Sequence, residues 1–151
     1  MVWADVVADL TATLAQLTIT SPVAVAIAHV YPEPPATVQV FPAFVVCLPD
    51  SIEVDRSDGL RTETNAVRCR YLALEGGDAA TTAKIADAFR QASVAAFDAK
   101  VNGHGGVTLG GTGILNAQTV DVIEFGAYAG KPVVMFETTL TIRHDTLVNL
   151  S

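Results

Sequence analysis

The stretch HVYPEPPATVQVFPAFVVCLPD, residues 29–50, decides the fold because a proline-rich crossing leads directly into a fully apolar segment. Five of the seven prolines lie between Pro32 and Pro49. Proline holds φ at about −65° and has no amide donor, so residues 31–35 are predicted to form an extended linker. Residues 43–48 are an unbroken apolar run of strand length that turn-forming residues end. They predict a central strand that is covered on both faces.

The composition predicts one compact domain over residues 1–151, because half of the residues are hydrophobic and mean hydropathy is +0.40. The net charge of −7 disfavours nucleic-acid binding, which needs clustered lysine and arginine. Cys47 and Cys69 lie in apolar, strand-like runs and are predicted to be free thiols. No leader pattern and no apolar run of membrane-spanning length is visible, so we expect a cytosolic protein with no membrane partner.

The segments before the crossing predict a helix and a short strand. Apolar residues recur every three or four positions from Trp3 to Leu17, which is typical of an amphipathic helix. Residues 23–30 are rich in valine, isoleucine and alanine and predict a strand. His29 has no second metal-type residue at helical or strand spacing, so we interpret it as a hydrogen-bonded histidine at a strand end.

Charged residues dominate the segment 49–64, which predicts a solvated loop or a hairpin tip. The segment does not have glycine and a distal glutamate at the positions that an EF-hand calcium loop requires. The charged residues of this segment are Asp50, Glu53, Asp55, Arg56, Asp58, Arg61 and Glu63. Residues 65–74 then alternate as a strand with one wet face, where Arg68 and Arg70 should point together. This arginine pair is either a candidate interface or simply solvated.

The second half of the chain predicts a long helix, a glycine-rich loop and two strands. Asp78 is placed to cap a helix over residues 81–100, and Gly103 to end it. The following loop lacks the Gly-Lys-Ser/Thr end of a P-loop and the preceding strand of a dinucleotide site. It is either an assembly loop, ordered by neighbouring subunits, or a plain mobile linker. Its candidate residues are Gly103, His104, Gly105, Gly106, Gly110, Gly111 and Gly113.

Residues 114–123 and 134–143 alternate as strands and should form a hairpin, with turns at 124–126 and 130–132. The predicted fold class is therefore α+β: a mostly antiparallel β-sheet with two α-helices packed on one face, in a single domain with long loops. No nucleophile elbow, histidine spacing or cysteine–histidine pair indicates catalysis. We accordingly assign no catalytic residue, metal ligand or cofactor.

The order of these segments resembles the tail terminator and tail-completion proteins of long-tailed phages. The resemblance depends mainly on the Val-Tyr-Pro-x-Pro-Pro crossing at residues 30–35 and on Pro42 followed by the buried Ala-Phe-Val-Val strand. It also includes the first helix, the acidic segment, the arginine-bearing strand, the second helix and the closing hairpin, and so covers nearly the whole chain. The long glycine-rich loop departs from it.

The resemblance implies a structural virion protein in the tail–neck region, assembled in the host cytoplasm. Such a protein caps the tail tube, ends its polymerisation and joins the tail to the head connector as a ring, usually of six copies. Its partners would be copies of itself, the tail tube protein and the head-completion or connector protein. DNA would pass through the lumen without specific binding, since acidic side chains there repel phosphates. The lumen, or the contact with the tail tube or connector, would then be formed by Asp50, Glu53, Asp55, Asp58 and Glu63, with Arg56 and Arg61 pairing across subunits.

Two other classes of function remain open from the sequence. One is a different phage neck, head-closure or minor tail protein of similar build, which its neighbours in the virion would distinguish. The other is a small cytosolic enzyme or ligand-binding domain, which would need an enclosed pocket with convergent polar groups, for example around His104 or His144.

Overall fold

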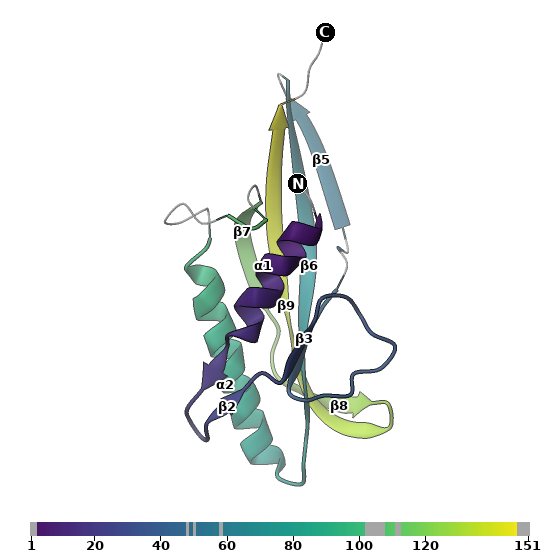
Figure 1. Ribbon diagram of the computed structural model, residues 1–151, viewed down its shortest axis with the longest axis vertical. Helices are drawn as coiled ribbons and strands as arrows, with labels where there is room; N and C mark the ends of the chain where they lie inside the picture. Colours follow the sequence, from purple (N-terminus) through teal and green to yellow (C-terminus); the bar gives the residue numbers. More distant parts are fainter. Residues whose placement is uncertain are drawn as a thin grey trace.

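The computed structural model describes residues 3–47, 49, 51–57, 59–101, 108–110 and 113–147. It is an α+β fold with two helices and a mostly antiparallel sheet, as predicted (Figure 1). The helices are α1 (Trp3–Ala15) and α2 (Ala79–Asp98). The strands are β1 (Thr18–Ile19), β2 (Val25–Ala26), β3 (His29–Tyr31), β4 (Ala43–Val46), β5 (Ser51–Ser57), β6 (Leu60–Leu74), β7 (Ile114–Val120), β8 (Glu124–Tyr128) and β9 (Lys131–Leu147).

The main sheet is built around one long antiparallel pair, β6 and β9. These strands pair continuously from Leu60 opposite Leu147 to Leu74 opposite Val133. The sheet order is β3-β4-β6-β9-β7, with β5 on the free part of β6 and β8 on the free part of β9. Among the strands of the described residues, only β3 and β4 run parallel to each other. Figure 1 shows that β5, β6 and β9 extend together beyond α1 toward one end of the molecule.

Strand β4 confirms the prediction from the deciding stretch, because all four of its residues are buried. Phe44 and Val46 belong to the main hydrophobic cluster, whereas Ala43 and Val45 belong to a second, smaller cluster. Residues 32–42 form no helix or strand, and they cover β4 by placing Val38 in the second cluster. Proline thus keeps the crossing out of the sheet and leaves it available as a cover.

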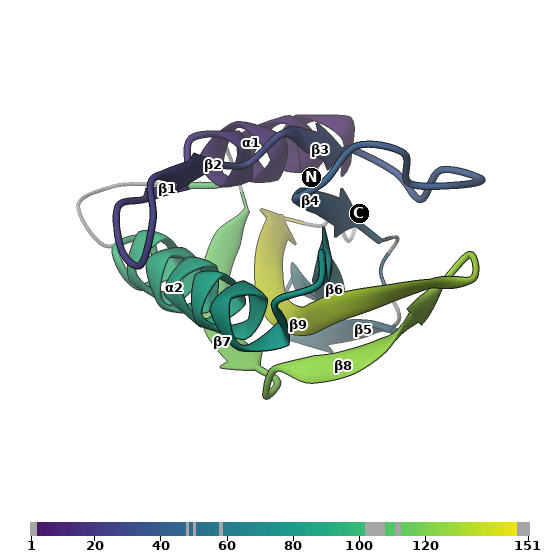
Figure 2. The same ribbon diagram turned by 90° about the horizontal axis from the view of Figure 1, so that it is seen from below.

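The main cluster is centred on Tyr71 of β6. The Tyr71 ring stacks on Phe136 with 4.9 Å between ring centroids, and Phe44 and Phe89 lie at 5.4 and 5.5 Å. Both helices contribute to the same cluster. Figure 2 shows the two helices and the strands from below. Their fully buried side chains recur at helical spacing, namely Val6, Leu10 and Leu14 of α1 and Ala86, Phe89, Ser93 and Phe97 of α2.

The predicted helix start at Asp78 is confirmed. Its Oδ1 accepts a hydrogen bond from the amide of Thr81 at 3.1 Å, which satisfies one of the unpaired amides of the first turn. Helix α1 ends at Ala15, slightly before the predicted end at Leu17. Leu17 is nevertheless buried in the main cluster, because the chain turns there into β1.

The single strand predicted for residues 23–30 is wrong, because this segment serves two different partners. Its first part, β2, pairs with β1 in a separate two-stranded sheet. Its last part belongs to β3, which pairs with β4 in the main sheet. Ile27 and Ala28 connect the two through amides bonded to the carbonyls of Leu17 and Pro42. Apolar composition indicates burial here but not the change of partner.

The turn predicted for residues 124–126 is also wrong, since these residues begin strand β8. Strands β7 and β8 lie one after the other along the same edge of β9. The tight turn is instead at Ala129 and Gly130, which both have positive φ and join Tyr128 to Lys131. Two positive φ angles give the twist that a two-residue hairpin requires. The predicted pairing of residues 114–123 with 134–143 is correct.

Candidate functional site

The acidic segment 49–64 is a β-hairpin rather than a loop, which confirms the hairpin alternative for the described residues. Strand β5 pairs with β6 from Ser51 opposite Ala66 to Ser57 opposite Leu60. Because successive side chains of a strand point to opposite faces, this hairpin divides the predicted charged set between two surfaces. The proposed interface residues Asp50 and Asp58 lie outside the described residues.

One face of the hairpin is acidic. Glu53 and Asp55 are exposed on it and make no ion pair within the described part of the chain. On β9, Asp145 lies on the same face, because it is opposite Thr62 and Thr62 is opposite Asp55. Arg143, opposite Thr64, is also on this face and forms an ion pair with Asp145 at 3.5 Å, so the unpaired acids described on this face are Glu53 and Asp55. The Thr62 hydroxyl donates a hydrogen bond to Asp145 at 3.0 Å. This surface is named the acidic face.

The opposite face carries the remaining charged residues of the predicted set together with two apolar side chains. Arg56 and Arg61 lie directly opposite each other, and Glu63 follows on the same side of the sheet. Like charges in this position repel and weaken the pair. Ile52 and Val54 share this face and are 57% and 51% exposed. The predicted charged set therefore does not form a single surface.

Arg68 and Arg70 point together, as predicted, but both are held by one carboxylate. Glu137 of β9 accepts from Arg68 Nη1 at 3.3 Å through Oε1 and from Arg70 at 3.0 Å through Oε2. The pair lies between two shallow hollows of about 380 and 410 Å³ on the face away from the main cluster. The two arginines thus form ion pairs with Glu137 within the sheet and are not simply solvated, which was one of the two sequence interpretations.

The glycine-rich loop is described only at residues 108–110 and from Gly113, so Gly103, His104, Gly105, Gly106 and Gly111 are outside the described residues. The described part packs on the molecule itself. Leu109 is buried in the main cluster and pairs with Gly113 through two amide–carbonyl bonds of 2.7 Å. The amide of Gly110 donates to Asp9 of α1. This part of the loop needs no neighbouring subunit for order.

The outer edges of the main sheet are largely open within the described residues. Strand β5 pairs only with β6 and β8 only with β9, whereas β7 pairs with β9 and makes one isolated bridge from Leu115 to Val101. Large apolar side chains are exposed at each edge: Ile52 and Val54 on β5, and Val122 and Phe125 at and beside β8. Exposed apolar edge strands invite pairing with another chain, and natural proteins usually protect them.

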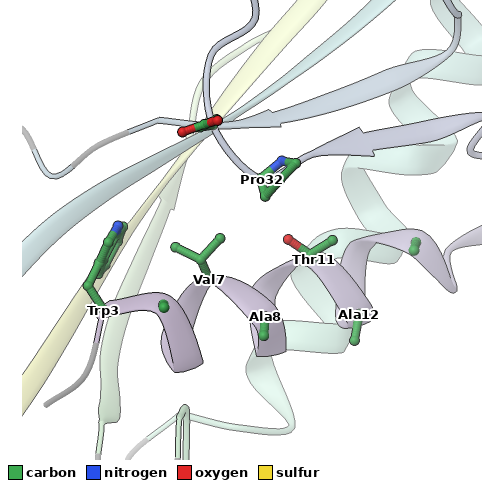
Figure 3. Close-up of a pocket in the computed structure, with 9 residues that line it drawn as sticks. Trp3, Val7, Ala8, Thr11, Ala12 and Pro32 are labelled. Atoms are coloured by element: carbon green, nitrogen blue, oxygen red, sulfur yellow. The ribbon is translucent and has the colours of Figure 1, made fainter.

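A long apolar groove runs along the outer side of α1 (Figure 3). Its volume is about 700 Å³, and Trp3 lies at one end. Figure 3 shows that Val7 and Thr11 point from α1 toward Pro32, which forms the other wall. Exposed alanines leave the groove open along the helix. Its lining residues are Trp3, Ala4, Val7, Ala8, Thr11, Ala12, Ala15, Pro32 and Glu33.

The groove and the open edge of β5 are the features that sequence reasoning missed. For β5 a signal was present, because Ile52 and Val54 alternate with acids before an Asp-Gly pair, which is a typical two-residue hairpin turn. For the groove the only signal was the repeat of small residues on one side of the first helix, at Ala4, Ala8 and Ala12. The sequence interpretation considered only the apolar side of this helix.

Buried titratable groups lie in the core rather than in a cleft with partners. Neither Cys47 nor Cys69 is in a disulfide, as predicted, and Cys69 is fully buried. Burial, with smaller contributions from Cys47 and Glu137, raises the pKa of the Cys69 thiol to about 12. Burial also raises the pKa of Tyr71, whose hydroxyl has no hydrogen-bond partner within the described residues. Neither group is activated for chemistry near neutral pH.

These two pKa shifts predict a loss of stability in alkaline solution. An unfolded chain releases the thiol and phenol protons near their ordinary pKa values of 9.0 and 10.0, whereas the folded chain retains them. The free energy of unfolding should therefore fall as pH rises from about 9, by up to about 1.4 kcal/mol per pH unit for each group. Urea unfolding at several pH values measures this slope. Tyr71→Phe should make the slope shallower above pH 10, and an unchanged slope would contradict the assignment to Tyr71.

Among the described residues there is no group of three or more histidine, cysteine, aspartate or glutamate side chains that could hold a metal ion. Within the same residues, neither helix is long and apolar enough to cross a membrane. No protein-family model matches the sequence, and no curated protein is similar to it. The surfaces described above are therefore the basis for a functional assignment.

Proposed function

We propose that this protein is a structural component of a phage tail that assembles as a ring, caps the tail tube, ends its polymerisation and joins the tail to the head connector. The observation that carries the proposal is the open edge of β5 with its exposed Ile52 and Val54. An edge strand of this kind is an aggregation hazard in a monomer but a ready interface in an assembly. The resemblance in the order of segments supplies the kind of assembly.

A ring follows if the two open edges meet. Strand β5 lies at one edge and β7 with β8 at the other, so a contact between them joins different surfaces of successive copies. Contacts of this head-to-tail type close into rings when the rotation between copies divides a full turn. The resemblance supports six copies, with the tail tube protein and the head connector as the neighbours on either side.

The acidic face gives the ring a lumen suited to DNA. Glu53 and Asp55 lie on the face opposite Ile52 and Val54, so apolar contacts between copies leave these acids uncovered. A negative wall repels phosphates over several ångströms and lets DNA pass without specific binding. We propose no catalytic role and no cofactor for this surface, and we place the protein in the virion after assembly in the host cytoplasm.

We also propose that the chain is one structural domain with both helices on one face of the main sheet. In support, α1 and α2 place their buried side chains in the same cluster as the inward residues of β6 and β9. The second cluster contains no helical residue among those described. Ile52 and Val54 are then on the side of the helices, and the opposite face of the sheet carries Glu53 and Asp55.

The proposal is tested by the double variant Ile52→Asp/Val54→Asp. Both side chains are exposed, so the variant should fold normally, but charges at the edge should prevent apolar contact between copies. Light scattering and negative-stain imaging, alone and with tail tubes, should show rings for the natural protein and single subunits for the variant. Val40→Asp, at an exposed valine away from this edge, is the matched control. Rings of normal size in the double variant would refute the proposal.

A second test concerns the acidic face. Glu53→Gln/Asp55→Asn should leave folding and ring formation intact, because neither carboxylate pairs with a described residue. Joining of tails to heads, or passage of DNA, should be impaired. Normal virion assembly and infectivity would exclude a role for these acids.

The alternative function is that of a different neck or minor tail protein. Contact with head components rather than tail components would indicate this alternative.

A further inference from the structure

We propose that the groove along α1 receives the β8–β9 hairpin of the next copy of this chain. This inference rests on the proposed function, because the ring supplies the second copy, and it identifies which surfaces meet. No residue of the hairpin lines the groove of its own copy. A hairpin that fills this groove therefore belongs to another copy.

The groove is suited to an apolar insert with few polar groups. Its walls are mainly alanine, valine, tryptophan and proline, and the alanines of α1 leave room for larger side chains. Only two residues contribute polar side chains near its floor and rim, Thr11 and Glu33. The Thr11 hydroxyl is buried and has no hydrogen-bond partner within the described residues, so a donor or acceptor from an insert would satisfy it.

The β8–β9 hairpin has the matching composition. Phe125 is its most exposed large apolar residue, at 56%, and Val122, just before β8, is 74% exposed. Residues 125–132 read FGAYAGKP, so the hairpin is narrow, apolar and rich in small residues. Figure 1 shows it projecting from the lower part of the sheet. The two-residue turn holds it in a fixed shape, which lowers the entropy lost on insertion.

Charge complementarity determines which partner fits. Glu33 is the one charged residue among those that line the groove. The only charged residue in the hairpin segment 125–132 is Lys131, which is exposed and makes no ion pair within the described residues. A carboxylate at the groove and a lysine beside the hairpin turn, on two different parts of one chain, favour head-to-tail contact between copies.

The test uses two matched pairs of exposed sites. Ala8→Trp fills the groove, whereas Ala95→Trp adds the same side chain to the exposed side of α2. Lys131→Glu reverses the charge of the hairpin, whereas Lys84→Glu reverses an exposed charge on α2. Light scattering of the purified full-length proteins, with circular dichroism to verify folding, measures subunit association. Ala8→Trp should weaken association about tenfold or more and Lys131→Glu several-fold, with both controls unchanged.

Charge exchange provides the decisive variant. Glu33→Lys combined with Lys131→Glu should recover association that Lys131→Glu alone loses, since the opposite charges again face each other. If Ala8→Trp and Lys131→Glu both form normal rings, the groove is not the hairpin's site, although the proposed ring remains. If the natural protein stays monomeric even with tail tubes, the ring itself is refuted, and this contact with it.

Discussion

Replacing Phe136 with alanine is expected to lower the free energy of unfolding by about 3–5 kcal/mol, the usual cost of removing a large buried aromatic side chain. Phe136 stacks on Tyr71 at 4.9 Å and meets Phe44 edge-on at 6.0 Å, so its loss leaves a cavity among aromatic rings. The main cluster joins β6 and β9 to both helices and cannot collapse easily around this gap. Urea unfolding of the purified variant measures the change.

Phe125→Ala is the matched control for this prediction. It is also a phenylalanine of the β8–β9 hairpin region, but it is largely exposed. Its replacement should change the free energy of unfolding by less than about 0.5 kcal/mol and instead weaken association between copies. Equal losses of stability in the two variants would contradict the placement of Phe125 on the surface.

Gly110→Ala is expected to cost about 2–4 kcal/mol, because two separate penalties add at this position. Gly110 has a φ of +60°, which a residue with a Cβ adopts at a cost of about 1–2 kcal/mol. A Cβ here would also lie 2.7 Å from the backbone nitrogen of Val6, and a helix backbone cannot move aside. The variant should lose stability and detach the loop from α1.

Gly77→Ala separates these two penalties. Gly77 has a φ of +86°, but a Cβ there would meet nothing within 4 Å. Its replacement should therefore cost only about 1–2 kcal/mol, from the conformational penalty alone. Thermal or urea unfolding of both variants gives the difference. If the two alanine variants were equally stable, the close packing of the loop on α1 would be wrong.

The sequence predicted those elements whose burial is complete or strictly periodic. Residues 43–48 predicted a strand covered on both faces, because an apolar run of this length between prolines fits few structures other than a buried strand. Asp78 gave the start of α2 because capping is a local interaction. The strand pattern of residues 134–143 predicted the inward residues of β9, including Phe136 and Leu140.

The missed elements depend on their contacts more than on their own composition. Strand β5 is charged and exposed, and it is a strand because β6, the next strand along the chain, supplies its hydrogen bonds. Recognition of the strand would also have placed Glu53 and Glu63 on opposite faces, since register fixes both. The groove on α1 could not be predicted, because it depends on where the crossing at Pro32 passes the helix.

The continuous pairing of β6 with β9 also has a consequence for how quickly the chain folds. Leu60 pairs with Leu147 and Leu74 with Val133. The chain between β6 and β9 contains α2, β7 and β8, so pairing of these two strands closes a long loop. Such contacts between distant parts of a chain have a high entropic barrier and make folding slow. The local β5–β6 hairpin can form within microseconds, long before β9 arrives. During that interval β6 exposes a second unpaired edge, and chaperone binding or a low concentration of nascent chains would favour folding over aggregation.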